Sequence, residues 1–422
     1  MRISGLRVHE VGPFAELSLA FPEGKDPTKA DTVLLVGPNG SGKSTLLYTI
    51  VGLFSVQGPE LGERFRSSNS DCSIDVVAGA DLFTLFATPP RSDRTFGGGS
   101  LQGARHWIHY PPALWSGTLI DDTIVDVSKT VKSAKLIYAY SGTRTIGQAN
   151  QQNLPSGPLQ HALDWSKPYT FETFLDWVKD ILGRRNSALV KGENDDAQRI
   201  SAGLRRLEDF ISEVVGAPSV FDVRTEDGTI VLVTGQHTTP INLLPEGLKS
   251  LLSWMGDLLR RLYSLTTGGV PHHELPIVLL LDEIEVHLHP KWQRLVVPAV
   301  ERLLPNAQIF MSTHSPFVIA SASDAQIIWL SENGTVRDDL PTDSLRGFSY
   351  PAILELMGID SLQDVETQRQ LGELDQVVAD VRSGMKELSD FDSVADRLPQ
   401  TEDVLLTVDF QRSQLKRLLR TA

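Results

Sequence analysis

The sequence predicts an α/β fold because three apolar runs, each typical of a buried strand, end in a polar segment. Residues 33–36 lead into a glycine-rich loop, residues 277–281 into two acidic residues, and residues 307–311 into Ser-Thr-His-Ser. The carboxyl ends of parallel strands lie at one edge of a sheet, where α/β folds bind their ligands. We therefore expect a parallel sheet that brings the three polar segments together.

The composition is that of an ordinary globular protein. Of 422 residues, 41% are hydrophobic and 22% charged, which suits two or three compact units. The net charge of −14 argues against a surface that is basic throughout, but leaves room for a local basic groove. Cys72 is the only cysteine, so an internal disulfide is excluded. With apolar runs too short to cross a bilayer, we expect a cytoplasmic protein and no membrane partner.

Residues 1–150 are expected to form an N-terminal lobe. Two segments near the start alternate between apolar and polar side chains, as half-buried strands do. A short buried strand, a glycine-rich loop and an apolar helix follow, and the rest of the lobe is rich in strands. The expected elements are strands at residues 6–8, 17–21, 33–36 and 135–140 and a helix at residues 46–53.

Residues 151–218 are expected to form a helical hairpin arm, because apolar residues recur there at helical spacing. A polar turn at residues 191–196 separates two such stretches. The second has the spacing of a coiled coil but lasts only about two heptads, so the arm is short. The apolar positions are Phe171, Phe174, Leu175, Val178 and Leu182, then Ile200, Leu204, Leu207, Ile211 and Val214.

Residues 219–335 are expected to form a C-terminal lobe, and residues 336–422 a helical C-terminal extension. The lobe begins with two strands and a strongly periodic helix, and continues as strand, helix and strand. The extension is mostly helical, less periodic and without an internal repeat. The elements expected at the start of the lobe are strands at residues 219–223 and 229–234 and a helix at residues 248–262.

Residues 37–45, GPNGSGKST, match the phosphate-loop pattern in the strand, loop and helix context that it requires. The glycines let backbone N–H groups face a phosphate, and the helix start adds partial positive charge. Lys43 is expected to reach the β- and γ-phosphates of ATP, and the Ser44 hydroxyl to bind Mg²⁺. The expected nucleotide-binding residues of this loop are Pro38, Asn39, Gly40, Ser41, Gly42, Lys43, Ser44 and Thr45.

Two further polar segments are expected to complete a site that hydrolyses ATP. Asp282 would emerge from its strand beside the Mg²⁺, and Glu283 would polarise the attacking water. His314 follows the next strand and could contact the γ-phosphate or the water. The alternatives are two acids that match a helix dipole and a structural histidine. The predicted catalytic residues are Glu283, Lys43 and His314, and the predicted metal ligands are Ser44 and Asp282.

Together these motifs resemble the ABC-type ATPases of the SMC, RecF and OLD group. The resemblance implies an ATPase head with an N-terminal β-subdomain, and it covers the chain from residue 1 to about residue 330. The N-terminal lobe would carry the Walker A loop, and the C-terminal lobe the signature, Walker B, D-loop and histidine switch. The segments that carry the resemblance are GPNGSGKST at 37–45, LPEGLKS at 244–250, LDEIEVHLHP at 281–290 and STHSP at 312–316.

The resemblance implies that residues 244–249 are the signature, which covers the ATP bound by another subunit. Glu246, Gly247 and Lys249 would then contact that nucleotide. The free N–H groups at a helix start form an anion site, which agrees with this role. Pro245 stands where the group usually has serine, so one hydroxyl donor is missing and the hydrolysis rate is in doubt. A plain helix start is the alternative.

The same resemblance places a D-loop, where two subunits meet, at residues 286–289. Glu285, His287 and His289 have an alternative interpretation as metal ligands. A Q-loop would leave the core near residues 140–144, and Gln148 is the nearest glutamine.

The implied function is a slow switch in which the chain closes around ATP as a dimer or higher oligomer and reopens after hydrolysis. We find no carboxylate cluster like that of the Toprim domain of OLD nucleases. The C-terminal segment looks instead like that of Septu-type and retron-associated defence ATPases, which act beside a separate nuclease or toxin. This resemblance implies an ATPase that regulates an effector in bacterial anti-phage defence.

The alternative is a RecF-like clamp that encloses DNA in repair or maintenance. Basic side chains near the expected dimer face are compatible with DNA, whereas the net charge of −14 does not favour it. Binding of DNA or RNA therefore stays open. The basic residues are Lys249, Arg260, Arg261, Lys291 and Arg294.

Overall fold

The computed structural model divides the chain into two compact units, Met1–Tyr350 and Pro351–Ala422. The second unit was expected to begin at residue 336. Residues 336–350 belong to the first unit because the chain still packs on it there, as the rings of Tyr350 and Phe317 show by lying 5.0 Å apart. The structure describes residues 2–21, 29–54, 64–78, 81–88, 105–109, 136–142, 171–224, 226–265, 271–343, 345–359, 364–399 and 401–421.

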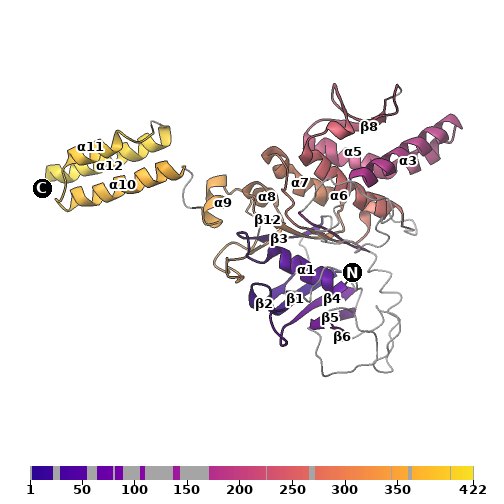
Figure 1. Ribbon diagram of the computed structural model, residues 1–422, viewed down its shortest axis with the longest axis horizontal. Coiled ribbons are helices and arrows are strands. Elements are labelled where there is room, and N and C mark those ends of the chain that lie inside the picture. Colours follow the sequence, from indigo (N-terminus) through magenta and orange to yellow (C-terminus); the bar gives the residue numbers. More distant parts are fainter. Residues whose placement is uncertain are drawn as a thin grey trace. The chain divides into compact units, whose positions relative to one another are not determined.

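A five-stranded parallel sheet lies at the centre of the first unit, with the strand order β13-β3-β12-β11-β7 (Figure 1). Its middle strands are nearly continuous apolar runs because both faces of the sheet are covered. The predicted α/β fold with a parallel sheet is confirmed. The strands are β3 (Asp31–Val36), β7 (Ile137–Tyr140), β11 (Val278–Leu281), β12 (Gln308–Thr313) and β13 (Gln326–Trp329).

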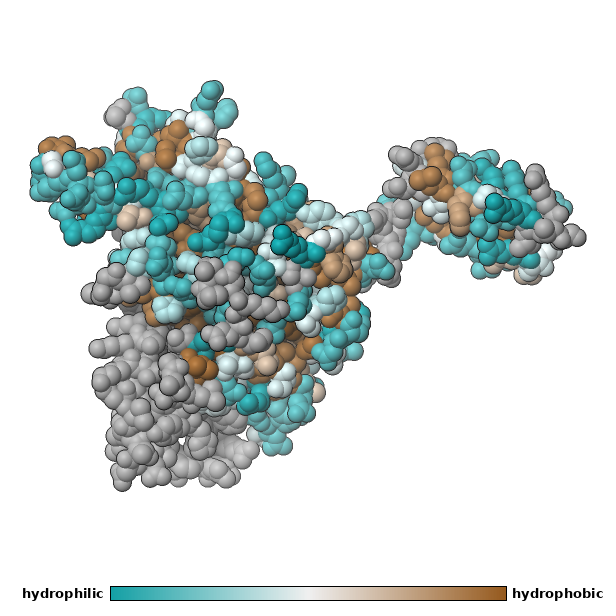
Figure 2. Space-filling view, turned by 180° about the vertical axis from the view of Figure 1, so that it is seen from behind, coloured by the Kyte–Doolittle hydropathy of each residue, from teal (hydrophilic) through white to brown (hydrophobic). Residues whose placement is uncertain are grey.

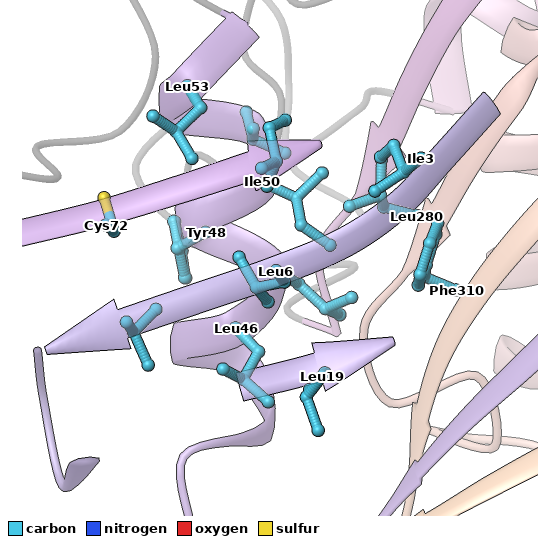
Figure 3. Close-up of a cluster of buried hydrophobic side chains, with 14 of the residues drawn as sticks. Ile3, Leu6, Leu19, Leu46, Tyr48, Ile50, Leu53, Cys72, Leu280 and Phe310 are labelled. Atoms are coloured by element: carbon cyan, nitrogen blue, oxygen red, sulfur yellow. The ribbon is translucent and has the colours of Figure 1, made fainter. Parts of the chain in front are cut away.

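A second, antiparallel sheet forms the N-terminal β-subdomain, in the order β2-β1-β4-β5-β6. Helix α1 (Lys43–Phe54) contributes to one apolar core with strands of both sheets. Figure 3 shows this core, in which Ile3 lies near Leu280 and Phe310 of the central sheet. The strands are β1 (Arg2–Val11), β2 (Phe14–Ala20), β4 (Asp71–Ala78), β5 (Asp81–Thr88) and β6 (Arg105–His109).

The two predicted hairpin helices are present, but the second is broken and both pack on the rest of the unit. Its break at Ser201 separates α4 from α5. The apolar face of α5 packs on α6, α7 and β8. Helix α3 packs on α6, where a Cβ atom on Gly256 would lie 2.3 Å from the Phe174 ring. The helices are α3 (Phe171–Val190), α4 (Asn194–Ile200), α5 (Ala202–Val215), α6 (Glu246–Tyr263) and α7 (Pro290–Leu303).

Shorter elements connect these helices to the central sheet. A three-stranded antiparallel sheet, in the order β10-β9-β8, lies between α5 and α6 in the chain. Residues 151–170 of the expected arm lie outside the described residues. The elements are β8 (Ser219–Val223), β9 (Ile230–Thr234), β10 (His237–Pro240), the 3-10 helices η4 (Ile241–Leu243) and η5 (His272–Glu274), and helix α8 (Pro316–Ser321).

The second unit is helical, as predicted, and has its own apolar core. Asp364 caps its first long helix by accepting hydrogen bonds from the N–H groups of Glu366 and Thr367, both at 3.1 Å. On the face of this unit seen in Figure 2, hydrophilic side chains lie beside a smaller hydrophobic group. The chain enters the unit through α9 (Tyr350–Leu356), and the helices of the core are α10 (Val365–Arg382), α11 (Leu388–Ala395) and α12 (Glu402–Thr421).

Across the described part of the chain, every helix is too short or too polar to span a membrane.

The side-chain amide of Gln308 is a buried link between the two sheets of the first unit. The side chain of Gln308, at the start of β12, accepts a hydrogen bond from the N–H of Ile3 and donates one to its carbonyl, both at 2.7 Å. Gln308 and Ile3 are both buried, so water does not replace these bonds if they are lost.

We predict that Gln308→Met, which keeps the side-chain length but removes both hydrogen bonds, lowers the free energy of unfolding by about 3 kcal/mol. Urea unfolding followed by circular dichroism measures this. The control is Gln326→Met, because the Gln326 amide makes an exposed bond to the Ala20 carbonyl and its loss should cost less than about 0.5 kcal/mol. Equal losses in the two variants would contradict the prediction.

Candidate functional site

The phosphate loop joins the end of β3 to α1 and is held in shape by close contacts. Gly42 has a φ of +96°, and a Cβ atom there would lie 2.3 Å from the Phe14 ring. Position 42 therefore accepts only glycine. The Lys43 ammonium donates to the carbonyls of Gly37 and Pro38 at 2.8 and 2.9 Å, so the lysine lies along the inside of its own loop.

Lys43 is a buried cation at the edge of the sheet, 6% exposed. Burial lowers the pKa of its ammonium, and the carboxylates that follow β11 oppose this effect. An anion such as a phosphate would compensate the charge of Lys43 better than the two neutral carbonyls that it contacts here. The loop and its lysine thus have the chemistry of a phosphate site.

Asp282 lies directly beside the phosphate loop, although 238 residues separate it from Ser44. The Ser44 hydroxyl donates to its Oδ1 atom at 3.0 Å, and the Ser312 hydroxyl donates to the same atom. The Asp282 N–H donates to the Tyr140 carbonyl at 2.9 Å, which joins the ends of β11 and β7. A fully buried carboxylate next to a hydroxyl is a donor pair of the hard oxygen type that Mg²⁺ prefers. The predicted metal ligands Ser44 and Asp282 therefore fit this ion.

Glu283 is held in a strained turn at the same edge. Its φ is +46°, and its N–H donates to the Ser312 hydroxyl at 2.7 Å. Burial raises the pKa of the Glu283 carboxyl, and the charge of Asp282 raises it further. A Cβ atom on Gly142, just after β7, would lie 2.9 Å from Glu283, so the small residue makes room for it. Strained, half-buried acids of this kind are typical of catalytic sites.

His314 follows β12 and reaches the same group of residues. Its Nδ1 atom lies 3.1 Å from the Oε1 atom of Glu285, which is buried. His287, by contrast, is exposed with a φ of +65°, and His289 caps α7 by accepting from the Lys291 N–H at 3.2 Å. The described residues contain no group of three or more His, Cys, Asp or Glu side chains that could hold a metal ion. The alternative of a metal site at residues 285–289 is therefore not supported.

The segment expected to be the signature lies at the start of α6, against the turn that follows β11. Pro245 is the N-cap residue, with an extended backbone and no side-chain hydrogen bond to the helix. A Cβ atom on Gly247 would lie 2.3 Å from the His287 carbonyl oxygen, so the helix start and this turn form one surface. Lys249 lies beside Glu246, with 3.3 Å between the Nζ and Oε1 atoms.

Several of the basic residues considered as DNA contacts have partners within the chain. The carboxylate of Asp257 in α6 accepts hydrogen bonds from Arg260 at 2.7 Å and Arg261 at 2.6 Å. The Tyr140 hydroxyl also donates to Asp257, at 3.0 Å. The guanidinium of Arg294 lies over a tyrosine ring, 5.6 Å from its centroid. These contacts reduce the positive charge available to a nucleic acid.

Sequence reasoning missed one cation beside the phosphate loop. The Arg64 guanidinium donates to the Thr45 hydroxyl at 3.1 Å and lies 3.9 Å above the Tyr48 ring. No motif marks this arginine, which follows α1 in a segment without helical or strand periodicity. The expected Q-loop glutamine, Gln148, lies outside the described residues.

Two family models match the sequence. The first is an AAA domain, whose description also names the AbiEii toxin and the Type IV TA system, and it matches residues 126–320. The second, also described as an AAA domain, matches residues 1–73.

The sequence is similar to those of a retron ATPase and a Septu protein. "Retron Vc95 probable ATPase" of Vibrio cholerae serotype O1 biovar El Tor is 38% identical over 399 residues, which cover 79% of this chain and 74% of the relative. "Septu protein PtuA" of Bacillus thuringiensis is 22% identical over 371 residues, 85% of this chain and 84% of that protein. Among solved structures, the SmcHead bound to the C-winged helix domain of ScpA aligns with 82% of this chain and 98% of its own, at 15% identity and a TM-score of 0.48.

We predict that Arg64→Ala weakens ATP binding about tenfold, or about 1.4 kcal/mol, because it removes a positive charge next to the phosphate loop. Isothermal titration calorimetry with Glu283→Gln as the background would measure the affinity without hydrolysis. Arg66→Ala is the control, since Arg66 is an exposed arginine two residues away. An Arg64→Ala affinity within about twofold of the control would contradict a role for this cation at the nucleotide.

Proposed function

The chain belongs to the same family as the Retron Vc95 probable ATPase, and on this premise we propose that it is a defence ATPase with a separate effector. It would bind and slowly hydrolyse ATP, close as a dimer around the nucleotide, and regulate a nuclease or toxin in bacterial anti-phage defence.

The observation that carries this proposal is the hydrogen bond between Ser44 and Asp282 at 3.0 Å. It unites the phosphate loop with the acidic end of β11 at one edge of the parallel sheet. Lys43 is next to Ser44 and Glu283 next to Asp282, so all four groups that ATP hydrolysis needs lie at this edge. This arrangement supports binding of ATP rather than of an unrelated phosphate ligand.

In the proposed mechanism, the loop N–H groups and Lys43 bind the phosphates, and Glu283 orients the attacking water and accepts its proton. The raised pKa of the Glu283 carboxyl makes it a better proton acceptor than an ordinary glutamate. Ser44 and Asp282 would hold Mg²⁺, which supplies positive charge to the phosphates when bound. Ser312 keeps Asp282 and Glu283 in position, because its hydroxyl bonds to both residues.

Dimerisation is supported by the surface that Gly247 and His287 form together. The start of α6 carries N–H groups that lack intrahelical acceptors, and such groups attract a phosphate from another subunit. The contact between Gly247 and the His287 carbonyl couples this helix start to the turn after Glu283. Because Pro245 brings no hydroxyl to the site, we propose a slow reaction suited to a switch.

A separate effector is proposed from the names of the relatives, which are a retron ATPase and a Septu protein. The arginines bound to Asp257 give the DNA clamp no specific support. We therefore propose a protein partner and a second copy of this chain as the main contacts.

We predict that two inactive variants restore activity to each other. Lys43→Ala removes the chain's own phosphate contact, and Lys249→Glu places a negative charge where the partner's ATP would bind. In a mixed dimer, the intact loop of one subunit faces the intact helix start of the other. An equal mixture should regain about a quarter of the wild-type rate per chain, since half of the dimers are mixed and each has one good site. Phosphate release measures this rate.

The unmixed variants and a mixture of Lys43→Ala with Glu283→Gln are the controls. The second mixture has two different defects on the same side of the site, so no mixed dimer contains an intact site. Activity of the Lys249→Glu variant equal to wild type, or no recovery in the first mixture, would contradict the proposed dimer.

A further inference from the structure

We propose that Glu285 is a positioning residue for ATP hydrolysis, which fixes the ring of His314 so that its Nε2 atom is presented to the nucleotide. The inference rests on the proposed function, since it assigns a role within the same site. Glu285 itself would touch neither the nucleotide nor the attacking water.

Glu285 contacts both the backbone and the ring of His314. The Oε1 atom of Glu285 accepts a hydrogen bond from the backbone N–H of His314 at 2.6 Å and lies 3.1 Å from its Nδ1 atom. The Glu285 side chain is 4% exposed, whereas the His314 side chain is 49% exposed. One buried carboxylate oxygen thus contacts both the backbone and the ring of His314, and about half of the His314 side chain stays exposed.

This contact determines which ring nitrogen can act. The negative Oε1 atom lies 3.1 Å from Nδ1, so it favours a proton rather than a lone pair on that nitrogen. Nε2 is then the nitrogen left to face a water or phosphate oxygen. Without the carboxylate, the ring can rotate and the proton can move to the other nitrogen.

The surrounding loops have their own support, so the role of Glu285 can be separated from loop stability. Gln293 of α7 donates to the Leu288 carbonyl at 2.9 Å and accepts from the Ser315 hydroxyl at 2.7 Å. It therefore joins the turn after β11 to the turn after β12 without using the Glu285 side chain. Removal of the Glu285 charge should leave both turns in place.

The other oxygen of the carboxylate argues against a purely structural role. Within the described residues, Glu285 Oε2 is buried and has no hydrogen-bond partner. A buried charged oxygen without a hydrogen-bond partner lowers the stability of the fold. Stability alone therefore does not explain a glutamate, rather than a neutral side chain, at position 285. Glutamine has the same shape, and its carbonyl oxygen would still accept the His314 N–H.

Glu285→Gln, His314→Gln and the double variant form a double-mutant cycle that tests the proposal. We expect Glu285→Gln to lower kcat about tenfold and to leave KM within about twofold. In the His314→Gln background, the same change should alter kcat by less than about twofold, because the ring that it positions is absent. The control is Glu301→Gln, another buried glutamate, which bonds to Thr32 at the opposite end of β3 and should leave kcat unchanged.

Nitrogen-15 spectra of the histidine rings, with His314→Gln to identify the signal, provide a readout that needs no activity. We expect Nδ1 of His314 to be protonated in the wild type and to lose this fixed state in Glu285→Gln. Independent, multiplicative effects on kcat, or an unchanged ring spectrum in Glu285→Gln, would overturn the proposal. Absence of ATP hydrolysis by the wild type would instead overturn the proposed function, and the spectra would still test the position of the ring.

Discussion

The parallel pairing of β3, β12 and β11 is the constraint on which the site depends. Each strand contributes only a few polar residues at its end. The parallel register brings the carboxyl ends of all three strands to one edge of the sheet. The Ser312 hydroxyl then bonds to both Asp282 and the Glu283 backbone, and the Ser44 hydroxyl bonds to Asp282. The acidic and phosphate-binding halves of the site are therefore positioned by the sheet core rather than by flexible loops.

The start and the middle of α6 both connect to this edge. Gly247 packs on the turn after β11, and Asp257 accepts a hydrogen bond from the Tyr140 hydroxyl at the end of β7. The Tyr140 carbonyl in turn accepts from the Asp282 N–H. A shift of α6 caused by a second subunit would thus reach the residues around Glu283, the proposed catalytic residue, through two separate contacts. This coupling suits a switch that responds to assembly.

Much of the central sheet and site could be predicted because the signals are local. The phosphate loop and the acidic end of β11 follow uninterrupted apolar runs. The strands predicted at residues 33–36 and 277–281 and the helix predicted at residues 46–53 are present in the structure. The break at Ser201 and the packing of α5 on α6 and α7 depend on tertiary contacts that a helical period does not contain. Arg64 reaches the site through space and without a motif, so no sequence pattern selects it. Gly142 lies in the segment expected to be the Q-loop, but its packing against Glu283 depends on a tertiary contact.

Light scattering of Glu283→Gln, with and without ATP and Mg²⁺, shows whether two chains close around ATP. This variant can bind ATP but should hydrolyse it poorly, so the closed state should accumulate. ATP should at least double the mass relative to the nucleotide-free protein, and adding Lys43→Ala to the same chain should abolish the increase. A mass that does not change with ATP, in a protein shown to bind it, would rule out closure of two chains around the nucleotide.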